Sequence, residues 1–403
     1  MGGRVALDVS VDSVRDLLGF TGPASPTTRD ALLRTARGDG HKLAATLLSL
    51  WAAAGEDLSA AERAELSACR ERIDFYGRIW GELRLLAPEL FLLKGMTVAA
   101  LYPPGVLRSA GDLDVVCQSH RDFWRSACHL AETDWELAAF TVGPAEPGAG
   151  VPYHLFAEFR RPGTGPGGEP DPDAEPYAIG LVTAEIVTDI RRPARQLGRP
   201  VRSPLAASAV ALVAERWERP FRSRDLLDLS LLLADLDPAA LEQVRADLAR
   251  IGLWPEWREA VRAIRHLGRP APAVFPGTRS GAARERLLRG SRLLRRWANP
   301  VRVLAIAAQS GVEDRVGRLA DAASDLVQRR VDGRRLLAAG VLLFGVPLEG
   351  PPVHEPRLDD VGHHLVARTP IGSFLLVAGA ARQEWLDELE QPNEKDLDAA
   401  REW

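Results

Sequence analysis

Apolar positions recur at helical spacing through the first part of the chain. In residues 70–86 the apolar side chains that fall on one helix face are Ile73, Tyr76, Trp80 and Leu83. Ser59 is followed three residues later by Glu62, which is the pattern of a capping box and predicts a helix start. Pro88 ends this stretch, so we expect residues 1–87 to form a helical N-terminal region.

The pattern then changes to short apolar or alternating runs that are separated by helical segments. Strands are expected at 90–93, 113–117, 135–142, 153–160 and 183–190. Helices are expected at 96–102 and 120–132, and the Pro-, Gly- and Asp-rich residues 162–176 are expected to form a loop. The sequence therefore predicts a mixed core of strands and helices over residues 88–200.

Residues 201–250 return to helical spacing, with a helix expected over 203–234, and we interpret them as a helical cap. Residues 251–403 form a C-terminal accessory region of different character. Its segment 284–296 is rich in Arg, residues 346–362 are Pro-rich and loop-like, and residues 363–367 and 373–378 could form a hairpin. The Arg-rich segment could bind RNA, but Trp297 is the one aromatic residue beside it, so a solvated helix face is favoured.

Composition narrows the class of protein. The 403 residues are 46% hydrophobic and 26% charged, which is typical of globular proteins of two or three domains. A formal charge of −4 does not favour nucleic acid as a partner of the whole chain. The three cysteines, Cys69, Cys117 and Cys128, are too far apart for a zinc knuckle. The start lacks a signal-peptide pattern and the longest apolar run has 11 residues (336–346), so we expect a cytoplasmic protein without membrane contact.

The candidate chemistry centres on two acidic residues. Because side chains alternate along a strand, Asp112 and Asp114 are expected to project from the same face while Leu113 points into the core. Two carboxylates about 7 Å apart repel each other unless a cation lies between them. Magnesium prefers such oxygen ligands, and a pair of ions can hold a phosphoryl group between them.

A second group of residues has the chemistry of a phosphate site. Lys94 and Gly95 stand where the expected strand 90–93 turns into a helix. Gly95 allows backbone N–H groups to approach a ligand, the helix start adds partial positive charge, and Lys94 adds a full charge. Arg108 follows closely, and its guanidinium can bind either a phosphate or one of the two aspartates.

These residues occur in an order that resembles a known family. Leu92-Leu93-Lys94-Gly95, Tyr102-Pro103, Arg108 and Gly111-Asp112-Leu113-Asp114 match the signature of the uncharacterised nucleotidyltransferase family 5, within the DNA polymerase β-like superfamily. The resemblance extends over roughly residues 25–240. It implies an α+β fold, in which a polymerase β-like mixed sheet is flanked by helices, with extra helical and C-terminal regions.

The resemblance also implies an activity. Asp112, Asp114 and a third carboxylate would bind two Mg²⁺ ions, and Lys94, Gly95, Arg108 and Ser109 would bind the nucleotide. The enzyme would move a nucleoside monophosphate from an NTP such as ATP to a hydroxyl or other acceptor on a small molecule, peptide or protein. Related families often occur in natural-product biosynthesis.

Two residues could supply the third carboxylate. Glu185 lies in the expected strand 183–190, which alternates cleanly and resembles the family's Glu-x-His strand with Val187 in place of His. Glu158, in the expected strand 153–160, is the second choice.

Two other functions remain open at this point. The chain could be an inactive nucleotidyltransferase fold that binds a peptide or nucleotide as a scaffold. It could also modify RNA through the Arg-rich C-terminal part, in which case RNA binding would depend steeply on salt.

Overall fold

The computed structural model describes most of the chain in two compact units. The described residues are 9–20, 28–145, 151–163, 169, 171, 174–185, 203–217, 219–267, 332–338, 341–362, 364–379 and 381–390. Unit 1 comprises Met1–Val116, Pro162–Ile179 and Gln196–Arg289, and unit 2 comprises Cys117–Arg161, Gly180–Arg195 and Gly290–Trp403. The Arg-rich segment 284–296 lies outside the described residues.

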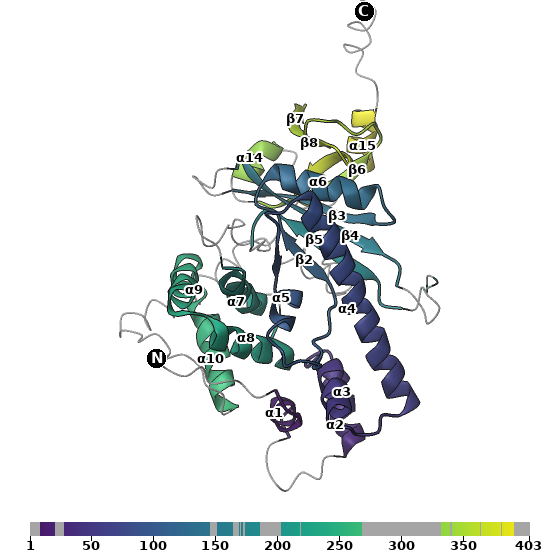
Figure 1. Ribbon diagram of the computed structural model, residues 1–403. Helices are drawn as coiled ribbons and strands as arrows, with labels where there is room; N and C mark the ends of the chain where they lie inside the picture. The colour runs from purple at the N-terminus through teal and green to yellow at the C-terminus, as the bar shows by residue number, and fades with distance from the viewer. Residues whose placement is uncertain are drawn as a thin grey trace, which may run out of the picture. The chain divides into compact units, whose positions relative to one another are not determined.

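The first part of unit 1 is helical, as the sequence predicts. Its helices are α1 (Val11–Leu17), α2 (Arg29–Arg37), α3 (Ala44–Ala53) and α4 (Ala60–Leu86) (Figure 1). The capping box is present at the start of α4, where the Ser59 hydroxyl accepts the Glu62 N–H and the Glu62 carboxylate accepts the Ser59 N–H. This cap begins one continuous helix of 27 residues, so the capping box and the apolar face of residues 70–86 belong to the same element.

Two short strands and a short helix follow in unit 1. Strand β1 (Phe91–Leu93) pairs antiparallel with β2 (Leu113–Val116), and α5 (Gly95–Ala99) begins directly after β1. The register places Leu93 opposite Asp114. These elements confirm the expected strand, turn and strand of the motif, with a helix shorter than expected.

The rest of unit 1 is a group of helices (Figure 1). They are α7 (Pro204–Ala214), the 3₁₀ turn η1 (Glu215–Trp217), α8 (Ser223–Asp235), α9 (Pro238–Ile251) and α10 (Trp254–His266). Helix α7 is buried from Ala206 to Val213 and contacts β1, α8 and α9. The single helix expected over 203–234 is two helices, because the chain leaves helical geometry around Pro220, which cannot donate a backbone hydrogen bond.

Unit 2 contains long antiparallel strands. Strand β3 (Glu136–Pro144) pairs with β4 (Tyr153–Arg161), and α6 (His120–Ala131) contacts both. Strand β5 (Tyr177–Val182) crosses from unit 1 into unit 2. The prediction of a strand at 183–190 is wrong for 183–185, which form a bend after β5, and residues 186–190 lie outside the described part of the chain.

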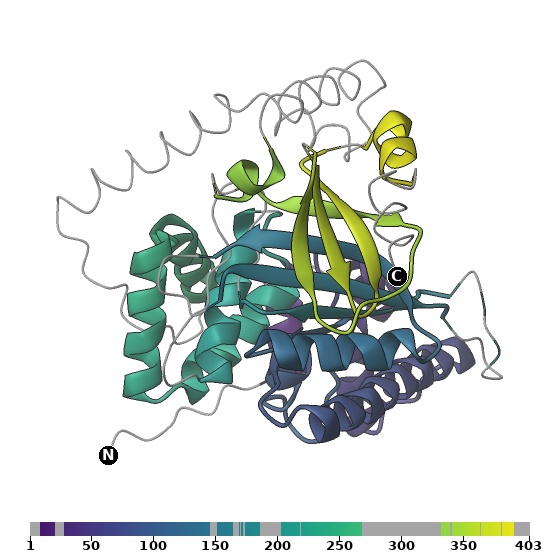
Figure 2. The ribbon, with the colours of Figure 1, turned by 90° about the horizontal axis from the view of Figure 1, so that it is seen from above.

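The C-terminal part of unit 2 continues the sheet (Figure 2). Its elements are α14 (Gly333–Ala338), β6 (Leu343–Leu348), β7 (Arg357–Val361), β8 (His364–Thr369), β9 (Gly372–Val377) and α15 (Gln383–Glu390). The expected hairpin is confirmed as β8 and β9. The loop expected over 346–362 is partly wrong, since it contains the end of β6 and all of β7. Pro347 lacks a backbone N–H, and a strand tolerates proline where one of its edges is not paired. At Pro347, which lies opposite Phe374 of β9, β6 has passed the two positions where it pairs with β3.

In the part of the chain that the structure describes, the strands form one nine-stranded sheet in the order β1-β2-β5-β4-β3-β6-β9-β8-β7. The fold is therefore mixed α+β, with helices accompanying a large sheet. Among the described residues, no helix is both long enough and apolar enough to cross a membrane.

Candidate functional site

The turn between β1 and α5 is strained at Lys94. This residue has φ 57° and ψ −128°, a conformation that residues other than glycine rarely adopt, and Gly95 follows with φ 25°. The Lys94 N–H donates to the Ser208 hydroxyl of α7 at 2.9 Å, which holds the strained turn against the helical group. Backbone strain of this kind persists where the surroundings fix it, and it is concentrated at functional sites.

Asp112 and Asp114 line the same small pocket of unit 1. The pocket has a volume of about 100 Å³, and its lining consists almost entirely of charged side chains. The basic lining residues are Lys94, Arg108, Arg219, Arg222 and Arg224, and the acidic ones are Asp112, Asp114, Glu215 and Asp225. Five positive and four negative charges nearly cancel, which suits a ligand that combines cations with phosphates better than a bare polyanion.

Lys94 connects two of the acidic residues in this pocket. Its Nζ lies 3.1 Å from Asp114 Oδ2 and 2.6 Å from Glu215 Oε1. Desolvation opposes the charge on Lys94, but Asp114 and Glu215 outweigh it and raise the pKa of the ammonium. Glu215 comes from η1 and is a pocket residue that the sequence did not indicate, although it lies in the expected helix 203–234.

Asp114 has an unusual electrostatic environment. Desolvation raises the pKa of Asp114 to about 6 although Lys94 lowers it, and the carboxylates of Asp112 and Glu215 raise it further. Desolvation also tends to raise the pKa of Glu215, but Lys94 and Arg219 bring it below its usual value. The crowding of carboxylates around Asp114 is the condition under which an additional cation would be stabilising.

Arg108 is engaged in a buried ion pair behind the pocket. It is 6% exposed, and its Nε and Nη2 lie 2.9 and 2.8 Å from Oδ2 of Asp228, which is fully buried. The Tyr102 hydroxyl donates to the other oxygen of Asp228 at 2.8 Å. Tyr102 and Arg108, two positions of the motif, are thus joined to α8 by one hydrogen-bonded network, and Arg108 pairs with neither Asp112 nor Asp114.

The remaining basic residues differ in how they are paired. Arg219 lies 2.5 Å from Asp225 and 2.8 Å from Glu215. Arg224 donates from Nη1 to both the carbonyl and the hydroxyl of Ser109 at 3.2 Å. Asp225 and Asp228 therefore form structural ion pairs, with Arg219 and Arg108 as their respective partners.

The segment before Asp112 is held by α4. Arg72 donates to the carbonyls of Ala110 (3.0 Å) and Gly111 (2.9 Å), and the Tyr76 hydroxyl donates to Gly111 at 2.9 Å. The same guanidinium also donates to the carbonyl of Glu175 at 2.8 Å. Arg72 and Tyr76 therefore position the backbone that leads into the acidic pair, a role that sequence spacing did not indicate.

The two candidates for the third carboxylate belong to unit 2, whereas the pocket is formed by unit 1. Glu185 follows β5 and is buried, with 3% exposure. Glu158 lies on β4, where its carboxylate is 2.6 Å from Arg160 Nε.

The donor set of the pocket fits magnesium that arrives with a nucleotide. In the described part of the chain, no three His, Cys, Asp or Glu side chains form a group that could hold a metal ion by themselves. Magnesium is usually bound by one or two carboxylates together with substrate phosphates, rather than by a cage made of protein alone. Asp112 and Asp114 can supply the two carboxylates, while Lys94 and the arginines can contact phosphate oxygens.

The chain was compared with protein-family models, with curated proteins and with solved structures, and none of them matches it.

Proposed function

We propose that the chain is a Mg²⁺-dependent nucleotidyltransferase, which moves a nucleoside monophosphate from an NTP to an acceptor. The observation that carries this proposal is that Asp112 and Asp114 line one pocket together with Lys94 and four arginines. Paired carboxylates and a ring of basic groups are what a Mg²⁺–triphosphate complex requires. The resemblance of the residues 92–114 to nucleotidyltransferase family 5 supports the same assignment.

The proposed reaction is an in-line displacement. The acceptor hydroxyl attacks the α-phosphorus, the bond from that phosphorus to the α,β-bridging oxygen breaks, and pyrophosphate leaves. One carboxylate of Asp112 and Asp114 takes up the hydroxyl proton. Lys94 and the pocket arginines orient the phosphates. When bound with the triphosphate, two Mg²⁺ ions would neutralise its charge and polarise the α-phosphate.

Glu185 is proposed as the third carboxylate, with Glu158 as the second choice. As Glu185 is the first choice, Glu185→Gln is expected to reduce transfer more than Glu158→Gln. Equal activity of the Glu185→Gln variant and the wild type would remove Glu185 from the mechanism.

The activity is tested with labelled nucleotides. The protein is incubated with Mg²⁺, each of the four α-³²P-labelled NTPs and a cell lysate as the source of acceptor. Label transfer is expected with at least one NTP, and Asp114→Asn is expected to lower its rate at least about 100-fold, because a carboxylate ligand is lost. The control is Asp134→Asn, since the Asp134 side chain is 82% exposed. Transfer that survives Asp114→Asn would contradict the proposal.

One observation favours an alternative function. The Lys94 ammonium, 3.1 Å from Asp114, lies where it could substitute for a metal ion. The chain would then be an inactive scaffold with a nucleotidyltransferase fold that binds a nucleotide or peptide. In that case nucleotide binding would be independent of Mg²⁺ and no label would be transferred, whereas the enzyme requires Mg²⁺ for both.

A further inference from the structure

A larger cavity of unit 1 lies beside the small charged pocket that Asp112 and Asp114 line. It has a volume of about 480 Å³, within the range of small-molecule sites. The segment from Arg108 to Asp112 separates the two spaces, because Arg108 and Asp112 line the small pocket while Ser109, Ala110 and Gly111 line the cavity. Arg224 lines both. A molecule in the cavity would therefore lie next to the groups that we propose to perform the transfer.

Two basic residues at one end of the cavity have unused binding capacity. Lys42 lines the cavity, and its side chain has no hydrogen-bond or ion-pair partner among the residues described. The Nε of Arg224 is buried and meets no acceptor within the described part of the chain, and its Nη1 donates to Ser109. Desolvation and the nearby Arg108 lower the pKa of the Arg224 guanidinium, although Asp228 and Asp225 raise it. A buried donor without an acceptor is costly, and an anionic ligand would satisfy it.

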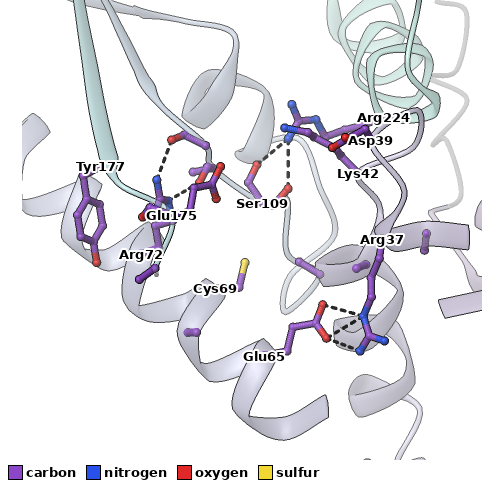
Figure 3. Close-up of a pocket in the computed structure, with 17 residues that line it drawn as sticks. Arg37, Asp39, Lys42, Glu65, Cys69, Arg72, Ser109, Glu175, Tyr177 and Arg224 are labelled. Carbon is purple, nitrogen blue, oxygen red and sulfur yellow. Dashed lines mark hydrogen bonds and ion pairs between the residues drawn. The ribbon is translucent and has the colours of Figure 1, made fainter. Parts of the chain in front are cut away.

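Backbone hydrogen bonds hold the segments that carry Lys42 and Arg224 close together. The Ser223 N–H donates to the carbonyl of Gly40, and the Arg224 N–H donates to the carbonyl of His41. These bonds attach the loop that carries Lys42 to the start of α8, which carries Arg224. Figure 3 shows Lys42, Asp39 and Arg224 gathered at one end of the cavity. With two cations and one carboxylate, this end carries a net positive charge.

The remaining lining does not resemble a site for a nucleobase. Tyr177 is the one aromatic residue among those that line the cavity, and it is 7% exposed. Its ring is covered by the Arg72 guanidinium at 4.6 Å and by Phe75 at 4.2 Å, so it offers little stacking surface. Another part of the lining carries Glu65, which is paired with Arg37 at 2.6 Å (Figure 3). Alanines line much of the rest of the cavity, so it is suited to a compact molecule with both polar and apolar parts.

We propose that this cavity binds the acceptor of the transfer reaction through an acidic group, a phosphate or a carboxylate, which Lys42 and Arg224 contact. The identity of this ligand as the acceptor rests on the proposed nucleotidyltransferase activity. The acceptor would then be a small molecule that carries both an acidic group and the hydroxyl that attacks the α-phosphorus.

The test measures binding by isothermal titration calorimetry, without Mg²⁺ or NTP. Inorganic phosphate and succinate are titrated in separate arms, which distinguishes a phosphate site from a carboxylate site. At least one of them is expected to bind, and Lys42→Asn is expected to raise its Kd at least about tenfold, because one charge-assisted contact is lost. Asn is chosen because it readily adopts the positive φ of 53° found at Lys42.

Two control variants make the result specific. Arg34→Ala removes an exposed arginine of α2 that lines neither space, and it is expected to leave the Kd unchanged. Arg222→Gln alters only the small pocket and reports on anions bound there. If neither probe binds, or if Lys42→Asn and the wild type have the same Kd, the cavity site is refuted.

The two proposals can fail separately. If anion binding depends on Lys42 but the chain transfers no label, the anion site is supported and its role as an acceptor site is refuted. If the chain transfers label but its anion binding does not depend on Lys42, the nucleotidyltransferase activity is supported and the cavity site is refuted.

Discussion

The buried ion pair between Arg108 and Asp228 allows a quantitative prediction. Arg108→Met keeps most of the side-chain volume but removes both donors to Oδ2 of Asp228, which lie at 2.9 and 2.8 Å. The carboxylate remains fully buried, with the Tyr102 hydroxyl as the hydrogen-bond partner of Oδ1. Leaving a buried charge without its partner costs about 3–5 kcal/mol. We expect the free energy of unfolding of unit 1 to fall by that amount.

The assay is urea unfolding, followed by tryptophan fluorescence and circular dichroism. The double variant Arg108→Met/Asp228→Leu is expected to be more stable than Arg108→Met alone, because no charge is left buried. The control is Arg216→Met, which breaks a partly exposed pair with Glu259 and should cost less than about 1 kcal/mol. A loss below about 1 kcal/mol in Arg108→Met, or a double variant no more stable than it, would refute this reasoning.

Three further predictions concern the strained turn at Lys94, the thiol of Cys69, and the hydrogen bonds from Arg72 to the backbone before Asp112. Ser208→Ala removes the acceptor of the Lys94 N–H and should lower the free energy of unfolding by about 1 kcal/mol in a urea titration; an unchanged value would show that the strained turn does not need this bond. Burial raises the pKa of Cys69 to about 11, so at pH 8 its thiolate fraction is roughly 100-fold below that of a thiol with a pKa of 9. Its alkylation by iodoacetamide, followed by peptide mass spectrometry, should be slower than that of a cysteine in a short peptide by that factor and should accelerate about tenfold per pH unit; equal rates at pH 8 would contradict the assignment. Arg72→Lys loses the planar guanidinium that donates to several carbonyls at once, including that of Gly111. The nucleotidyl transfer should therefore require a higher Mg²⁺ concentration. An unchanged dependence of the transfer rate on Mg²⁺ would exclude a positioning role for Arg72.

The local pattern of the sequence predicted the elements of the motif well. The alternation around Leu113 placed Asp112 and Asp114 on one side of a strand, and both line one pocket. The capping box of Ser59 and Glu62 predicted the start of α4. These features depend on contacts between residues that are close in the sequence, which is why spacing reveals them.

The strand before the candidate carboxylate was not predicted, for a physical reason. Strand β5 is almost entirely buried, so its apolar residues do not alternate with polar ones. Residues 183–190 do alternate, but 183–185 form a bend. A pattern that depends on one solvated face cannot identify a strand that is covered on both faces.

The partners of the basic residues also lay beyond the reach of the sequence. Glu215 reaches Lys94, and Asp228 reaches Arg108, across about 120 residues of chain. Many acidic residues stand at comparable separations, and spacing does not distinguish among them. The tertiary packing of α7 and α8 against the β1 region decides which carboxylate meets which cation.

The position of the backbone before Asp112 depends on the number of residues in helix α4. Ser59 caps the helix at one end, α3 packs against it, and Arg72 and Tyr76 reach Gly111 from farther along. Each residue of an α-helix advances the side chains by about 100° around the axis. One residue inserted between the cap and Arg72 would rotate the side chains that contact α3 by about 100° relative to those that donate to Gly111. This helix should therefore accept many substitutions on its solvent side and yet tolerate almost no insertion or deletion, so that homologous sequences would align through it without gaps.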